Sequence, residues 1–74
     1  MGTYNQLTAR EFQILSLLAA GNKDLNIASA LAIELETVKS HNKNIFRKLN
    51  VRNRAEAVLY LLNNQSIKIN TENT

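Results

Sequence analysis

Apolar side chains recur every three or four residues along most of the chain, a spacing that places them on one face of an α-helix. Four such stripes can be distinguished. Their members are Phe12, Leu15, Leu18 and Ala19; Ile27, Ala28 and Leu31; Leu35, Val38, Ile45, Phe46 and Leu49; and Ala55, Ala57, Val58, Leu59, Leu61 and Leu62. Proline, which breaks helices, is absent, and glycine occurs only twice. The pattern predicts an all-α fold with four helices.

Polar and small residues between the stripes predict where the first three helices begin and end. Thr8 and Glu11 have the spacing of a capping box at the start of the first helix. Gly21 suits the left-handed position that ends this helix. Asp24 is the expected N-cap of a short second helix. The third helix is predicted over residues 35–49, a length of about 22 Å.

The fourth helix is predicted over residues 54–63. Asn53 and Glu56 form a second pair with N-cap and N3 spacing, and Asn64 is a candidate left-handed cap at the far end. The residues after Asn64 are mostly polar, and we expect them to fray. The chain is therefore divided into a polar lead or linker stub at 1–6, a helical domain at 7–64 and a polar C-terminal tail at 65–74.

The apolar surface of the fourth helix is broader than a domain of this size needs for its own core. We expect part of it to contact a second subunit, because large exposed apolar patches commonly mark interfaces. The residues assigned to this homodimer interface are Ala55, Val58, Leu59 and Leu62. In the alternative, the tail folds back and covers the same surface with Ile67 and Ile69.

The third helix has a polar face that is strongly basic. No acidic residue occurs from Thr37 through Ala55, whereas six of the nine basic residues of the chain lie in that stretch. They are Lys39, Lys43, Arg47, Lys48, Arg52 and Arg54. A solvated helix usually mixes the two signs of charge, so this arrangement favours DNA as the partner. Because the preceding turn at 32–34 is short, the second and third helices are expected to form a helix-turn-helix.

Composition excludes several other classes of protein. The chain has 74 residues, a net charge of +3, no cysteine and a single histidine, His41. These features rule out a disulfide framework and make a zinc site implausible. We expect no catalytic residue, metal or cofactor, because the sequence lacks a nucleophile–base pair and a phosphate-binding glycine loop. No apolar run approaches the roughly 20 residues of a membrane span, and we expect a cytoplasmic protein.

The order of these features resembles one known family. The residues that carry the resemblance are Leu7-Thr8-x-Arg10-Glu11, Gly21, Ile27-Ala28-x-x-Leu31-x-Ile33, Thr37-Val38-Lys39-x-His41, Asn44-Ile45-x-x-Lys48-Leu49-x-Val51-x-x-Arg54 and Ala57-Val58. From Leu7 to about Leu62 the chain is similar to the LuxR/NarL-type (GerE-like) DNA-binding domain. The resemblance implies a transcription regulator that binds operator DNA, commonly as a dimer contacting through the fourth helix. It also implies base contacts from Lys39, Ser40 and Lys43, and a phosphate contact from Thr37.

The chemistry of the side chains agrees with these assignments. Lysine can donate to guanine O6 and N7, and a hydroxyl can serve several base edges. Arg47 lies farther along the helix and suits a phosphate, as do Lys23 and Arg54 near helix starts. Arg54 has a structural alternative, an ion pair with Glu11 as the candidate partner. Lys48 is expected to be a surface charge.

Three positions depart from the family pattern. Glu34 occupies the position of the usual serine cap before the third helix, and Leu25-Asn26 replaces the usual Lys-Glu at the start of the second. Asn42 lies in the middle of the apolar face of the third helix. A buried asparagine without hydrogen-bond partners would cost about 1–3 kcal/mol, and the sequence does not indicate what satisfies it.

Two functional hypotheses follow from these patterns. In the first, the chain is the C-terminal output domain of a response regulator or related regulator, or a small stand-alone regulator. In the second, the helix-turn-helix acts mainly through protein partners, in the manner of sigma-factor region 4 contacting RNA polymerase and promoter DNA. The acid-free basic stretch favours the first hypothesis, because such a field gives DNA affinity.

Overall fold

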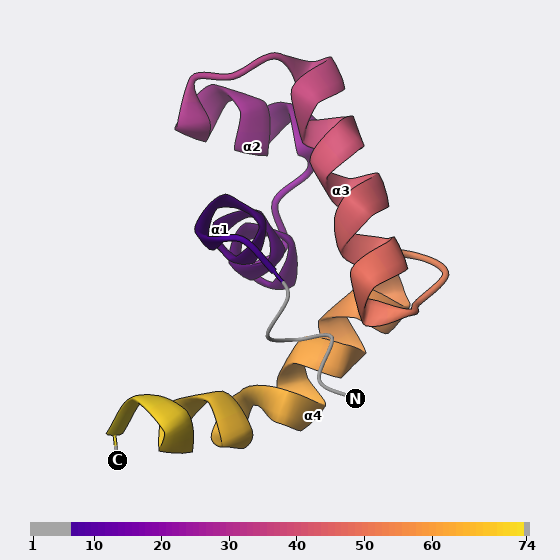
Figure 1. Cartoon of the computed structure of the whole chain (residues 1–74). Helices are drawn as coiled ribbons and strands as arrows, with labels where there is room; N and C mark the ends of the chain where they lie inside the picture. Colours follow the sequence, from indigo (N-terminus) through magenta and orange to yellow (C-terminus); the bar gives the residue numbers. More distant parts are fainter. Residues whose placement is uncertain (1–6, 74) are drawn as a thin grey trace.

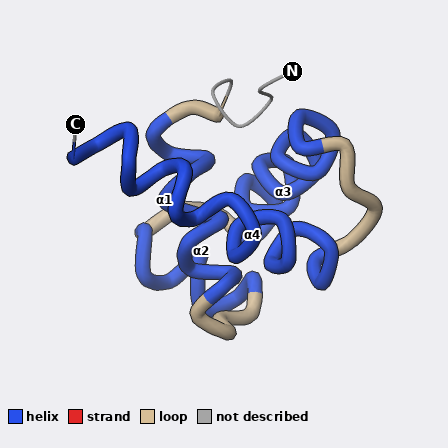
Figure 2. Tube along the Cα trace, turned by 90° about the horizontal axis from the view of Figure 1, so that it is seen from below, coloured by secondary structure: helices blue, strands red, loops and turns tan. Residues whose placement is uncertain are grey.

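The computed structural model describes the backbone of residues 7–73 and the side chains of residues 7–63. Its helices are α1 (Ala9–Ala19), α2 (Asp24–Leu31), α3 (Leu35–Leu49) and α4 (Arg54–Asn73). Figures 1 and 2 show these helices joined by short loops, and residues 7–73 contain no strand. The predicted all-α fold with four helices is confirmed. The predicted polar lead at 1–6 lies outside the described residues.

The core forms where α1 meets the three other helices (Figure 1). Its buried members come from all four helices: Ile14, Leu15, Leu18, Ile27, Ala28, Val38, Ile45, Leu49, Ala57 and Leu61. Complete burial of a valine, leucine or isoleucine side chain contributes about 1.5–3 kcal/mol. These residues belong to the predicted stripes, apart from Ile14, which widens the first one. The core therefore fixes the buried face of α3 and leaves the opposite face outside.

The start and end of α1 agree with the sequence. The hydroxyl of Thr8 accepts a hydrogen bond from the Glu11 N–H at 3.0 Å, and a Glu11 carboxylate oxygen accepts one from the Thr8 N–H at 3.0 Å. Gly21 has a φ of +96° just after the helix, a conformation that costs glycine little. The predicted capping box and the predicted left-handed glycine are both confirmed.

The start of α2 differs from the prediction. Lys23, and not Asp24, is the N-cap residue, and no side chain caps this end. Asp24 is the first helical residue, and its carboxylate instead accepts bonds from Asn42 and Arg54. The bond from Arg54 joins two oppositely charged groups, and such bonds are among the strong hydrogen bonds of proteins. The acidic group still lies in the first turn, where it complements the positive end of the helix.

The segment from α2 through α3 forms the predicted helix-turn-helix. Ala32 ends α2 in the left-handed conformation, with φ 57° and ψ 44°. The N–H of Ile33 bonds the Ala28 carbonyl at 3.0 Å, which closes the turn. Glu34 precedes α3 and makes no side-chain capping bond, as expected of a poor cap. Asn50 ends α3 with a φ of 59°, so the predicted bounds of this helix are confirmed.

The start of α4 was predicted correctly, but its end was not. The Asn53 side-chain oxygen accepts a bond from the Glu56 N–H at 2.9 Å, while the Glu56 carboxylate accepts one from the Arg52 N–H at 2.8 Å. The helix does not stop at Asn64 but continues to Asn73. The sequence after Asn64 contains neither glycine nor proline, so no residue there forces the helix to end.

Because α4 is continuous, the tail does not turn back over the earlier part of the helix (Figure 1). The alternative in which it covers the apolar face of α4 by folding back is therefore wrong. The side chains of Ile67 and Ile69 lie outside the described part of the chain. Fraying of this segment in solution stays a prediction.

Candidate nucleic-acid interface

The polar face of α3 is exposed along the length of the helix. Lys39, Ser40, Lys43 and Arg47 are all exposed, and they lie opposite the buried residues of the same helix. The nearest carboxylate to Lys39 is that of Glu36, at 3.9 Å, and both side chains are more than half exposed. An exposed pair at this distance is weak. The face therefore keeps its positive charge.

The residues predicted to contact phosphate are all exposed at least in part. Thr37 is exposed in the first turn of α3, and Lys23 is exposed at the N-cap of α2. Arg47 is exposed near the end of α3, and its guanidinium donates to the Asn44 side-chain oxygen at 2.9 Å. Arg54 lies at the start of α4 with a side chain that is 42% exposed. Two of these residues thus belong to α3, while Lys23 precedes α2 and Arg54 begins α4.

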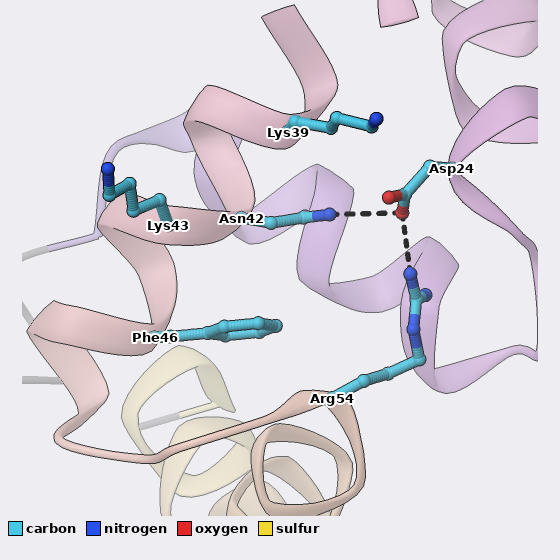
Figure 3. A pocket seen from close by; sticks show the side chains of 6 residues that line it. All are labelled: Asp24, Lys39, Asn42, Lys43, Phe46 and Arg54. Carbon is cyan, nitrogen blue, oxygen red and sulfur yellow. Dashed lines mark hydrogen bonds and ion pairs between the residues drawn. The ribbon is translucent and has the colours of Figure 1, made fainter. Parts of the chain in front are cut away.

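A hollow lies beside α3 on the side facing the starts of α2 and α4 (Figure 3). It is lined by Asp24, Lys39, Asn42, Lys43, Phe46 and Arg54. Both of the predicted base-contacting lysines, Lys39 and Lys43, thus share a surface with groups from two other helices. Figure 3 shows Lys39 extending on the side of Asp24, while Lys43 points to the other side.

Asp24 is the centre of a polar cluster in this hollow. Its Oδ1 atom accepts a hydrogen bond from Nδ2 of Asn42 at 3.0 Å and another from Nη2 of Arg54 at 2.6 Å. Nη1 of Arg54 also donates to the Asn22 carbonyl at 3.2 Å. The structural alternative for Arg54 is thus an ion pair with Asp24 and not with Glu11. We call Asp24, Asn42 and Arg54 the Asp24 cluster.

A second polar cluster, formed by Thr8, Glu11 and Lys48, joins the start of α1 to the last turn of α3. Nζ of Lys48 lies 2.8 Å from Oε1 of Glu11, with the two side chains 24% and 6% exposed. The expectation that Lys48 is a surface charge was wrong, because its ammonium group reaches a carboxylate that the capping box holds inside the domain. We call these residues the Glu11 cluster.

The environment of Glu11 favours its charged form. Burial on its own would raise the pKa of the carboxyl group, but the hydrogen bonds from Lys48 and from the Thr8 N–H lower it, as do the charges of Lys48 and His41. The pKa therefore lies below its ordinary value of 4.5. Glu11 is ionised at neutral pH and attracts Lys48.

The outer surface of α4 carries exposed apolar side chains. Leu59 and Leu62 are 57% and 56% exposed. Ala55 is also exposed, and Val58 is half-buried. The four residues predicted for a dimer interface are therefore accessible at least in part. Leu25, at the start of α2, is 66% exposed as well. The family usually has a charged residue at this position, so an exposed side chain is expected there.

Within residues 7–63, no group of three or more histidine, cysteine, aspartate or glutamate side chains is placed to hold a metal ion. Of the helices described, none combines the length and apolar character needed to cross a membrane.

Comparison with known proteins decides the family. A family described as "GerE: Bacterial regulatory proteins, luxR family" matches residues 5–61. The chain belongs to the luxR family. The match covers α1, α2, α3 and the first part of α4, which include both polar clusters and the basic face of α3.

Individual luxR-family relatives are response regulators. The chain is 45% identical over 65 residues to "Response regulator protein VraR" of Staphylococcus aureus (strain Mu3 / ATCC 700698). The proteins of the same name from Staphylococcus saprophyticus and Staphylococcus epidermidis are equally similar. In each case the alignment covers 88% of this chain but only 31% of the relative. The chain thus spans about a third of these curated relatives.

The sequence identified the exposed basic residues of this interface but missed what holds them in place. The two partners of Asp24 lie 18 and 30 residues away along the chain, and the partner of Lys48 lies 37 residues away. One signal was present: Asn42 interrupts an apolar stripe, and a polar residue in such a position implies a polar partner across the core.

Proposed function

We propose that this domain binds double-stranded DNA in a sequence-specific manner and serves as the output domain of a transcription regulator. The observation that carries the proposal is the exposed basic face of α3, where Lys39, Lys43 and Arg47 outnumber the single carboxylate of Glu36 and the opposite face is buried. A helix of this length fits the major groove, where base edges present a distinct pattern for each base pair.

In this proposal the bases are read by Lys39, Ser40 and Lys43. All three are exposed and lie within the first nine of the fifteen residues of α3, and the N-terminal part of a recognition helix commonly contacts base edges. The two ammonium groups suit the O6 and N7 acceptors of guanine, and the serine hydroxyl can donate or accept.

Contacts to phosphate are proposed for Thr37, Arg47, Lys23 and Arg54. Their positions on α3 and at the starts of α2 and α4 would fix the orientation of the domain on the duplex without reading sequence. Arg54 has a double role here. Part of its guanidinium bonds Asp24, and its 42% exposed side chain leaves another part open to a phosphate oxygen.

We further propose that two copies bind together through α4. The exposed Leu59 and Leu62 support this arrangement, since apolar side chains gain free energy when an interface covers them. A two-fold dimer would place two α3 helices on successive turns of the groove. The response-regulator relatives support an output-domain context, in which a further part of a larger protein receives the signal.

No catalytic step, metal or cofactor is part of this function, and DNA binding implies a cytoplasmic location. The exposed leucines of α4 also fit the second candidate, in which the helix-turn-helix acts mainly through a protein such as RNA polymerase. The two candidates differ in whether the domain distinguishes one DNA sequence from another.

The test is selection of bound duplexes from a random library, followed by affinity measurements at two salt concentrations. We expect an enriched motif with two-fold symmetry and binding that weakens as salt rises. An enriched motif without symmetry would contradict the dimer. Salt-sensitive binding with no enriched motif would contradict sequence-specific recognition and favour the protein-partner function.

A further inference from the structure

Asn42 is a polar residue in an apolar place. It is 7% exposed and lies on the face of α3 that carries the buried Val38 and Ile45. Its Nδ2 atom donates to Asp24 across the gap between α3 and α2 (Figure 3). The orientation of the amide follows from chemistry, because a carboxylate can only accept and must face the NH2 group.

Stability does not account for an asparagine at this position. Its Oδ1 atom is buried and has no hydrogen-bond partner among the described residues. A buried acceptor without a partner lowers stability, whereas an apolar side chain of similar size would pack there without this cost. The bond from Nδ2 to Asp24 offsets that cost without clearly exceeding it, so the free energy of folding gives no strong reason for an asparagine here.

We infer that Asn42 is a positioning residue, which sets through Asp24 the rotation of α3 and so the points from which Lys39 and Lys43 approach DNA. The inference rests on the proposed DNA-binding function. Asn42 precedes Lys43 directly and follows Lys39 by about one turn of the helix. All three residues line the same hollow.

The acceptor that holds Asn42 is itself anchored. Asp24 is bonded to Arg54 at 2.6 Å, and Arg54 is bonded to the Asn22 carbonyl at 3.2 Å. These bonds connect α3 to the start of α2, to the loop before it and to the start of α4. Figure 3 shows Asn42 and Arg54 converging on Asp24 from different parts of the chain.

A directional bond adds something that the apolar core does not supply. The hydrophobic effect is non-directional, while a hydrogen bond weakens when its angle departs from linear. At the roughly 6 Å radius where helical side chains end, a rotation of about 20° displaces a group by about 2 Å. A displacement of that size would break a base contact that needs a donor–acceptor distance near 3 Å.

The test compares affinity for the selected duplex with affinity for a scrambled duplex of equal length. The ratio of the two affinities is the specificity ratio. For Asn42→Val we expect this ratio to fall about tenfold, with non-specific affinity unchanged and the melting temperature equal or higher. Gln13→Ala, on the exposed side of α1, is the control and should leave the ratio and non-specific affinity at their wild-type values.

Two variants of Asp24 separate positioning from folding. Asp24→Asn keeps an oxygen that can accept from Asn42, so the ratio should stay near the wild-type value. Asp24→Leu removes the acceptor and should lower the ratio as Asn42→Val does. The double variant Asp24→Leu/Asn42→Val should be no less specific than either single variant, because both interrupt the same link.

Each outcome bears on the inference. A wild-type ratio in Asn42→Val or in Asp24→Leu would overturn it, as would a lower melting temperature accompanied by an unchanged ratio in the folded protein. If Asn42→Val does not fold, the contrast between Asp24→Asn and Asp24→Leu decides. Failure of the wild-type chain to select any motif would instead overturn the proposed function, and the inference with it.

Discussion

Two polar clusters attach α3 to the rest of the domain, and they differ in burial and in what lies beside them. In the Glu11 cluster, the carboxylate is 6% exposed and its lysine 24% exposed, and the pair joins the last turn of α3 to the start of α1. In the Asp24 cluster, the carboxylate and arginine are 24% and 42% exposed, and the pair borders the hollow that contains Lys39 and Lys43.

From this difference we expect the two clusters to contribute to different properties of the domain. Removal of one partner from a buried pair leaves an uncompensated charge and strongly destabilises a protein, so the Glu11 cluster should matter most for folding. Solvent weakens the more exposed pair, so the Asp24 cluster should matter less for folding and more for the geometry of the basic face. The following variants test this expectation, from the largest expected effect to the smallest.

The largest effect is expected from Lys48→Met. This change leaves the buried Glu11 carboxylate without its ammonium partner and should lower the free energy of unfolding by about 3 kcal/mol. Thermal or urea unfolding measures the loss. The double variant Glu11→Gln/Lys48→Met should recover part of it, because no charge is then left unpaired. An unchanged stability in Lys48→Met would show that the buried pair is dispensable.

Lys39→Ala and Lys43→Ala should act on binding and not on folding. We expect each to weaken binding to the selected duplex by roughly 1–3 kcal/mol, with a melting temperature close to that of the wild type. Arg52→Ala is a matched loss of one positive charge outside α3, from a side chain that is 88% exposed. Equal weakening in all three variants would mean that only the overall charge matters.

Thr8→Ala should have a smaller effect, confined to stability. The change removes the hydroxyl that accepts from the Glu11 N–H and should cost about 1 kcal/mol. The specificity ratio of the folded protein should remain that of the wild type. A reduced ratio would link the start of α1 to recognition and would contradict the separation of the two clusters.

The pH dependence of stability provides the finest test of the Glu11 cluster. Because the pKa of Glu11 is lowered in the folded protein, its contribution is fully present above the ordinary value of 4.5. It is lost as the pH falls below 4.5 and through the lowered pKa. The difference in unfolding free energy between the wild type and Glu11→Gln should therefore shrink in that acidic range. A constant difference from pH 3 to pH 7 would contradict this assignment.

Local signals account for the parts of the fold that could be predicted. The capping box of Thr8 and Glu11 and the bounds of α3 depend on residues a few positions apart. The same holds for the exposed basic face, since charge and apolar residues alternate with the period of the helix. Fold class and the exposed basic face of α3 therefore follow from local signals, whereas the candidate base contacts come from the family resemblance and stay a prediction.

The parts that could not be predicted depend on contacts between distant residues. Aspartate is a common N-cap residue, but the carboxylate of Asp24 accepts hydrogen bonds from Arg54 and Asn42 instead of capping the helix. The sequence around Lys48 predicts a surface charge, because its partner Glu11 is distant in the sequence and comes near only in the folded domain. The end of α4 was misplaced for a different reason, since asparagine permits a left-handed cap without requiring one.

The most direct test of base reading by α3 is a scan of the selected duplex with Lys43→Ala. Dissociation constants would be measured for the wild type and the variant on duplexes in which each base pair is replaced in turn. We predict that the variant loses discrimination at one or two positions in each half-site and keeps it elsewhere. Weaker binding by the same factor on every duplex would make Lys43 a phosphate contact and contradict the proposed reading of bases.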